Sequence, residues 1–162
     1  MKVLAWIGLL LLVLAALVVM AGQLGFLAGN MPTDLGVHGG RLKPPSATPN
    51  SVSSQADLYP DHAQRGYASI APLTFQGDTD AAMQKLATVL HQFERTTLVE
   101  QRSDYLYAQC STPLLKFTDD VEFWLDRKAG VIQVRSASRL GKGDLGANRA
   151  RVEKIRAQFQ KN

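Results

Sequence analysis

Residues 117–136 read FTDDVEFWLDRKAGVIQVRS, and they carry the clearest strand pattern in the chain. Its first half alternates apolar and polar side chains, and the turn RKAG separates it from a second run of β-forming residues. One antiparallel register places Phe123 opposite Val134 and Glu122 opposite Arg135, and these pairs are chemically sensible. A shift of one residue would move the apolar row to the wrong face. The stretch therefore predicts a hairpin with one apolar face.

Weaker patterns on both sides extend this hairpin into a domain. Residues 79–95 carry apolar side chains at spacings of three and four, which predicts a helix, and residues 96–101 and 105–112 read as two strands. Residues 147–160 predict a closing helix with a narrow apolar stripe. We expect an α+β fold with a four-stranded antiparallel sheet flanked by two helices.

The beginning of the 162-residue chain predicts a membrane anchor. Residues 3–22 are apolar and uncharged, and as a helix they would be about 30 Å long, the thickness of a bilayer's hydrocarbon core. A cleavable signal peptide is the alternative, but its apolar region has only about 7 to 15 residues before a cleavage site of small residues. We predict a signal anchor over residues 1–29, with residues 3–22 crossing the membrane once.

The flanking charges predict the orientation of this anchor. Lys2 precedes the span directly, whereas Arg41 and Lys43 lie well beyond it, so the positive-inside rule favours a cytoplasmic amino-terminal end and a domain outside the cytoplasm. A bacterial inner membrane facing the periplasm is the expected address. Export would separate the domain from nucleic acid despite a sequence pI near 9.4. The expected partners are the membrane, an anionic lipid or polymer, or an envelope protein.

Residues 30–65 are predicted to connect the anchor to the domain. Five of the seven prolines lie between residues 31 and 67, together with glycines and a serine-rich segment. Proline fixes φ and removes a backbone donor, and serine and glycine favour turns. We expect an extended connector over residues 30–65, with a candidate capping segment at residues 49–55, and a folded domain over residues 66–162.

The carboxyl-terminal part of the chain suggests an anion site. Residues 131–162 contain eight basic residues and only two acidic ones. Arg135 and Arg139 project from one strand face, and the glycine-rich turn at residues 141–146 offers backbone N–H groups at the start of a helix. The alternative is that these side chains solvate the helix and pair with acidic residues of the neighbouring strand.

The sequence predicts no catalytic site, no metal and no cofactor. Alternation sends Asp119 to the face opposite Asp120 and Glu122, which divides the acidic group, and no histidine accompanies it. Cys110 is the single cysteine, so it cannot form a disulfide within the chain, and it reads as a small buried hydrophobe. The chain has no P-loop, dinucleotide-binding fingerprint or nucleophile elbow.

Four motifs, in this order, resemble domain-of-unknown-function family 1499. They are PNSVSSQ (residues 49–55), DDVEF (119–123), GVIQVRSASR (130–139) and GKGDLGANR (141–149). The resemblance covers about residues 40–159 and implies an α+β domain of an envelope or organelle-associated protein, without a catalytic mechanism. It also implies that residues 49–55 belong to the folded domain. Many members have cysteine where this chain has Ser51, so a thiol role does not extend to this position.

If residues 49–55 belong to the domain, their polar groups can meet the basic strand in one polar pocket. The candidate ligand-binding residues are Asn50, Ser53, Ser54, Gln55, Arg135, Ser136, Ser138, Arg139, Asn148 and Arg149. The leading hypothesis is a non-enzymatic module that binds an anionic ligand, a lipid headgroup or a protein partner. A small hydrolase or transferase using this pocket, and a structural spacer of an envelope complex, are the alternatives.

Overall fold

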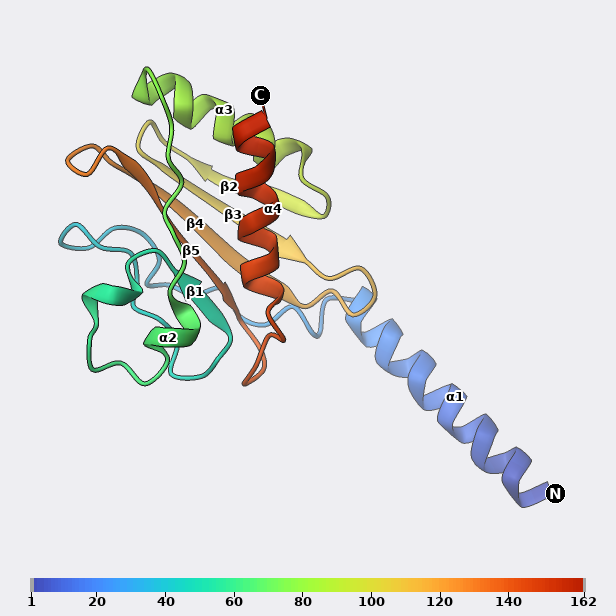
Figure 1. The fold of residues 1–162 in the computed structure, drawn as a ribbon. Helices are drawn as coiled ribbons and strands as arrows, with labels where there is room; N and C mark the ends of the chain where they lie inside the picture. The colour runs from blue at the N-terminus through green and yellow to red at the C-terminus, as the bar shows by residue number, and fades with distance from the viewer. Residues whose placement is uncertain (1, 162) are drawn as a thin grey trace.

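The computed structural model describes residues 2–161, which form an α+β domain preceded by a long helix (Figure 1). The helices are α1 (Lys2–Gln23), α2 (Arg65–Ala68), α3 (Thr79–Gln92) and α4 (Ala147–Lys161), with a short 3-10 helix at Ala56–Leu58. The strands are β1 (Ser51–Ser53), β2 (Thr96–Gln101), β3 (Tyr105–Ser111), β4 (Thr118–Asp126) and β5 (Val131–Ser138). They form one antiparallel sheet in the order β1-β5-β4-β3-β2.

The hairpin of β4 and β5 has the predicted register. Phe123 pairs with Val134, and Glu122 pairs with Arg135. The turn ends at Gly130, whose φ of 67° is a conformation that glycine adopts without steric cost. The alternation of apolar and polar residues was therefore sufficient to fix both the pairing and the faces.

The predicted count of four strands is wrong, because the sheet has a fifth strand, β1. It lies within residues 49–55, the candidate capping segment of the predicted connector, and contains only Ser-Val-Ser, which is too short and too polar to show an alternation. Val52 is fully buried in the main core, and Ser53 pairs with Arg135. The predicted connector also contains the short 3-10 helix at Ala56–Leu58.

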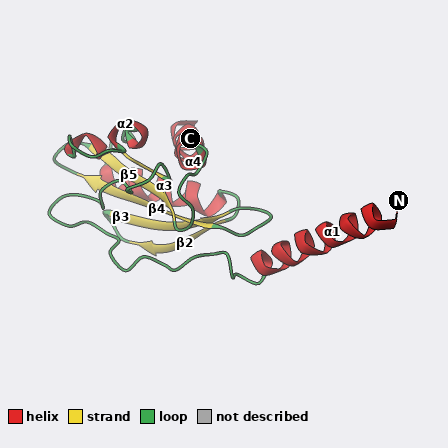
Figure 2. Ribbon diagram, turned by 90° about the horizontal axis from the view of Figure 1, so that it is seen from below, coloured by secondary structure: helices red, strands yellow, loops and turns green. Residues whose placement is uncertain are grey.

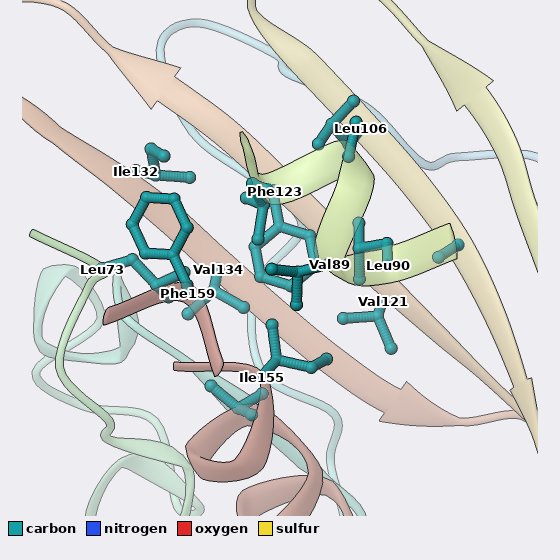
Figure 3. Close-up of a cluster of buried hydrophobic side chains, with 14 of the residues drawn as sticks. Leu73, Val89, Leu90, Leu106, Val121, Phe123, Ile132, Val134, Ile155 and Phe159 are labelled. Atoms are coloured by element: carbon teal, nitrogen blue, oxygen red, sulfur yellow. The ribbon is translucent and has the colours of Figure 1, made fainter. Parts of the chain in front are cut away.

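The helices α3 and α4 cover one face of the sheet, which we call the helix face (Figure 2). Apolar side chains from both layers meet there in the main core (Figure 3). Phe123 and Val134 come from the sheet, Leu86 comes from α3, and Ile155 comes from α4; all four have no exposed surface. Burial of this apolar area is the main force that holds the two layers together.

Residues 29–47, called the covering segment below, lie across the opposite face of the sheet (Figure 2). Leu42 is buried there against Tyr105 and Tyr107, and the backbone N–H of Gly36 donates to Glu122. The segment has hardly any regular structure, as its prolines and glycines predict. Its packing against the sheet was not predicted. We call this side of the sheet the covered face.

Helix α1 projects away from the domain and is exposed along nearly its whole length (Figure 1). It is long and apolar enough to cross a membrane, and a signal sequence near the beginning of a chain has the same properties. Its last residue, Gln23, donates from Nε2 to the backbone oxygen of Leu114 at 2.8 Å. The helix therefore ends against the loop between β3 and β4.

Candidate functional site

A cavity of about 370 Å³ lies between the covering segment and the sheet, next to the ends of β4 and β5. Four charged side chains line it: Lys43 from the covering segment, Asp120 from β4, Arg135 from β5, and Arg139 directly after β5. Three of these are basic and one is acidic. The lining itself therefore carries more positive than negative charge, although each of its cations is paired with a carboxylate: Lys43 with Asp34, Arg135 with Glu122 and Arg139 with Asp120.

Arg139 is held firmly by Asp120. Its Nε donates to Oδ2 at 2.9 Å and its Nη2 donates to Oδ1 at 2.7 Å, which is a bidentate ion pair. The hydroxyl of Tyr107 also donates to Asp120 Oδ1, at 2.6 Å. The hydrogen bonds to Asp120 raise the pKa of Arg139, and burial followed by the bond to Asp120 raises the pKa of Tyr107 to about 12. Arg139 is thus a fixed cation whose charge is already balanced.

Arg135 is bonded much more weakly, although it is only 4% exposed. Its Nε donates to the backbone oxygen of Pro44 at 3.3 Å, and this is the one hydrogen bond that its side chain makes within residues 2–161. Its Nη1 lies 3.6 Å from Oε2 of Glu122, which is an ion pair without a hydrogen bond. Burial lowers the pKa of Arg135 because the surroundings do not replace the water that the cation has lost.

Glu122 is the buried counterion of Arg135 and has no exposed surface. Its Oε1 accepts from the hydroxyl of Tyr105 at 2.9 Å and from the backbone N–H of Gly36 at 2.7 Å. Its Oε2 is buried and has no hydrogen-bond partner among the described residues. Burial, together with the Glu122 carboxylate, raises the pKa of Tyr105, so its hydroxyl stays a donor. Glu122 is thus positioned by two donors on one oxygen only.

Nη1 and Nη2 of Arg135 have no hydrogen-bond acceptor among the described residues and, unlike Oε2 of Glu122, they are not fully buried. A guanidinium presents five N–H donors in a planar fork that matches a carboxylate or a phosphate. The cavity beside Arg135 offers room for such a group. This arrangement can hold a small anion between Arg135 and the partly exposed Lys43.

A second polar cluster lies on the helix face, around Asn148. Its side chain has no exposed surface, and its amide is fully bonded. Nδ2 donates to oxygen atoms of Asn50, Ser138 and Asp144 at 2.8–3.0 Å. Oδ1 accepts from Ser136 at 2.6 Å and from Arg151 at 2.7 Å. Asn148 therefore connects the start of α4 to β5 and to the residue before β1. Its side-chain amide has no unused donor or acceptor for a ligand.

The remaining candidates from residues 49–55, and Arg149, make contacts within the fold. The Ser53 hydroxyl accepts from the backbone N–H of Gln55, and the Ser54 hydroxyl donates to Gln133 at 2.6 Å. Gln55 Oε1 accepts from the backbone N–H of Leu42 at 2.8 Å and so holds the covering segment. Arg149 donates to the backbone oxygen of Tyr67 at 2.6 Å.

The structure therefore divides the predicted polar pocket between the two faces of the sheet. Arg135 and Arg139 lie at the cavity on the covered face, whereas Ser136 and Asn148 meet on the helix face. Ser138 accepts from Asn148 and also borders the cavity. The reason is the period of two along β5, because neighbouring side chains of a strand point to opposite faces.

A family model described as a protein of unknown function, DUF1499, matches residues 41–159. The chain belongs to this family. The match confirms the resemblance drawn from the four motifs, and it contains all five strands together with the charged lining of the cavity. None of the curated proteins compared with the chain matches it.

Sequence reasoning missed the acidic and aromatic residues beside this cavity. Tyr105, Tyr107, Asp120 and Glu122 all lie on the covered face beside the arginines. The signal was present, because alternation in three neighbouring strands puts these residues on one face. Without the covering segment, such a face reads as solvent-exposed.

Elsewhere in residues 2–161, neither a metal-holding cluster nor a thiol with a lowered pKa is present. Within residues 2–161, no group of three or more His, Cys, Asp or Glu side chains could hold a metal ion. Burial raises the pKa of the Cys110 thiol, which disfavours the nucleophilic thiolate. The covered-face cavity is thus the arrangement with the clearest chemistry.

Proposed function

We propose that this DUF1499 protein is a membrane-anchored, non-enzymatic module that binds a small anion in the covered-face cavity. The proposal rests on the burial and the missing hydrogen-bond partners of the Arg135 side chain. Arg135 is a nearly buried cation at a cavity, and its Nη1 and Nη2 have no hydrogen-bond acceptor within residues 2–161. A carboxylate or phosphate group would accept from both nitrogens.

The neighbouring charges support an anion rather than a cation as the ligand. Asp120 is already engaged by Arg139 through two hydrogen bonds. Lys43 pairs with Asp34 at 2.7 Å, but its side chain is 34% exposed and can turn toward the cavity. An anion held by Arg135 and Lys43 would replace a weak surface pair with a charge-assisted contact in a less polar environment.

The proposed address is a single-pass membrane protein with a cytoplasmic amino-terminal side and a domain outside the cytoplasm, in a bacterial inner membrane facing the periplasm. The length and composition of α1 support a span, and Lys2 supports the orientation. In this arrangement the ligand is an anionic lipid headgroup, an acidic polymer or an anionic group of an envelope protein. A mature soluble form that begins beyond Gly22 would contradict the anchor.

Calorimetric titration of the full chain in detergent with inorganic phosphate, and separately with citrate, tests the binding proposal. We expect saturable binding of at least one anion. Arg135→Gln should weaken it by about tenfold or more, because a hydrogen bond to a charged group contributes about 1.5–3 kcal/mol. Arg127→Gln is the matched control. Arg127 lies in the β4–β5 turn at the other end of the sheet and pairs there with Asp80 of α3.

Lys43→Gln provides a second variant in case Arg135→Gln does not fold. Lys43 is partly exposed, so its loss leaves the core intact, and we expect several-fold weaker binding. Absence of saturable binding for both anions, or equal affinities in wild type, Arg135→Gln and Lys43→Gln, would refute the proposed function.

A further inference from the structure

The end of α1 contacts the domain through the loop between β3 and β4. Gln23 donates from Nε2 to the backbone oxygens of Leu114 at 2.8 Å and of Pro113 at 3.5 Å. At Gly22, an added Cβ would lie 2.6 Å from the backbone oxygen of Leu115. The helix and this loop are therefore in direct backbone contact.

The chain that follows α1 packs in the same way against the loop between β5 and α4. At Gly29, an added Cβ would lie 2.8 Å from Cβ of Arg139 and 3.0 Å from Cγ of Leu140. Figure 1 shows both loops on the side of the domain from which α1 projects. The domain is thus held directly at the end of α1 rather than at the end of an extended connector.

Exposed apolar side chains gather in these segments. The leucines and phenylalanine of this group, all at least 44% exposed, are Leu24, Phe26, Leu114, Leu140 and Leu145. Single exposed leucines are normal on protein surfaces, but these come from three segments at one end of the domain. The two loops also carry Lys116 and Lys142, which form no ion pair among the residues that the structure describes. Apolar side chains beside lysines are typical of surfaces at a membrane interface.

We propose that these segments (residues 24–26, 113–116 and 140–145), called the juxtamembrane face, rest in the headgroup region of the bilayer that α1 crosses. Their apolar side chains enter the interface, and Lys116 and Lys142 contact anionic headgroups. The inference rests on the membrane span in the proposed function, not on the anion cavity.

The partner of the juxtamembrane face is the bilayer, because the position of α1 determines where the bilayer lies. Helix α1 has 22 residues and so is about 33 Å long, slightly more than the hydrocarbon core of about 30 Å. If α1 spans the core, Gln23 lies at its boundary, and the loop bonded to Gln23 lies at the level of the headgroups. No linker separates this face from the lipid.

Lipid-borne quenchers test the proposal on the full chain in phosphatidylcholine vesicles containing phosphatidylglycerol. Fluorophores are attached to single cysteines at Gly143→Cys in the β5–α4 loop, Lys128→Cys in the β4–β5 turn and Val13→Cys in α1, each with Cys110→Ala. A side chain fits at residue 143, whose added Cβ meets only the backbone oxygen of Pro49 at 3.9 Å. We expect headgroup-located nitroxides to quench the label at residue 143 several-fold more than the label at residue 128.

Two further variants show which side chains make the contact. Leu114→Gln combined with Leu140→Gln should reduce the quenching at residue 143 several-fold. Leu58→Gln, which changes an exposed leucine on the 3-10 helix, should leave it unchanged. Vesicles of phosphatidylcholine alone should give weaker quenching because they lack the anionic headgroups that attract Lys116 and Lys142.

Three results would overturn the proposal. Equal quenching at residues 143 and 128 would place the face in water. Crosslinking between copies through residue 143 in the vesicles would assign the face to a second copy of the chain. No quenching of the label at residue 13 by nitroxides deep in the acyl chains would show that α1 does not span the bilayer, while leaving phosphate binding at the cavity unaffected.

Discussion

Both faces of the sheet are buried, but different interactions hold the layers that cover them. On the helix face, Val121, Phe123 and Val134 pack against α3 and α4 without exposed surface. On the covered face, the same two strands present Glu122 and Arg135, which are buried under a segment without regular structure. Apolar contacts are non-directional, whereas a buried ion pair requires donors and acceptors in defined positions.

This difference separates the part of the sheet that stabilises the fold from the part available for binding. Removing charges from water costs free energy that the pairing repays only when the geometry is good. The pair of Glu122 and Arg135 has poor geometry, with 3.6 Å between the closest atoms. The helix face should therefore carry most of the stability, and the covered face should tolerate replacement of whole ion pairs.

Substitutions in the core of the helix face should destabilise the protein most. Phe123→Ala should reduce the free energy of unfolding by about 3–5 kcal/mol, because it removes a buried ring and leaves a cavity. Urea unfolding of the full chain in detergent, followed by near-UV circular dichroism, measures this change. The control Val99→Ala, on a half-exposed side chain of β2, should change stability by less than about 0.5 kcal/mol. A loss below about 1 kcal/mol for Phe123→Ala would refute the assignment of stability to this face.

The second expected effect concerns the ion pair of Asp120 and Arg139. Asp120→Leu alone should cost about 3 kcal/mol, because it leaves the Arg139 guanidinium buried without its counterion. The double variant Asp120→Leu with Arg139→Met should recover the part of this loss that comes from the unpaired guanidinium, since an apolar pair of similar size needs no desolvation of charge, while the hydroxyl of Tyr107 still lacks its acceptor. The same urea unfolding measures both variants. A double variant as unstable as the single one would show that the covered face stabilises the fold through its charges.

The fold could be predicted wherever the pattern along one segment decides the structure. The register of β4 and β5 follows from alternation because a slip would expose Phe123 and bury Glu122 against apolar partners. Strand β1 has no such signal in its three residues, and its place beside β5 depends on burial of Val52 in a core made by distant segments. Tertiary contacts, not local pattern, decide that strand.

The cavity was predictable only in part. Alternation placed Arg135 and Arg139 on one face, and the structure has them at one cavity. The same alternation places Ser136 on the other face, where it meets Asn148 of α4, a consequence that the predicted common pocket ignored. The covering segment reads as a linker because prolines and glycines have the same composition in a linker and in an irregular packed segment. Burial of Leu42 against two tyrosines is visible only in three dimensions.

The smallest expected effect concerns the edge of the cavity, where Asp34 pairs with Lys43. The hydrogen bond from Lys43 is the main cause that lowers the pKa of Asp34. The folded pKa therefore lies below the unfolded one, so the stabilisation is present at neutral pH and is lost as the pH falls through the lowered pKa. Because Asp34 is largely exposed, this stabilisation is below about 1 kcal/mol. Asp34→Asn should therefore barely change unfolding by urea.

Asp34→Asn should strengthen anion binding, whereas loss of the Lys43 cation should weaken it. Without Asp34, the ammonium of Lys43 has no competing carboxylate, so inorganic phosphate should bind several-fold more tightly in calorimetric titration. Asp57→Asn is the matched control, because Asp57 also has an exposed ion pair, with Arg65, but does not line the cavity. Tighter phosphate binding in Asp34→Asn, with no change in Asp57→Asn, would show that Lys43 reaches the ligand. Weaker binding in Asp34→Asn would mean that the covering segment must be held in place by the Asp34–Lys43 pair before Arg135 can bind an anion.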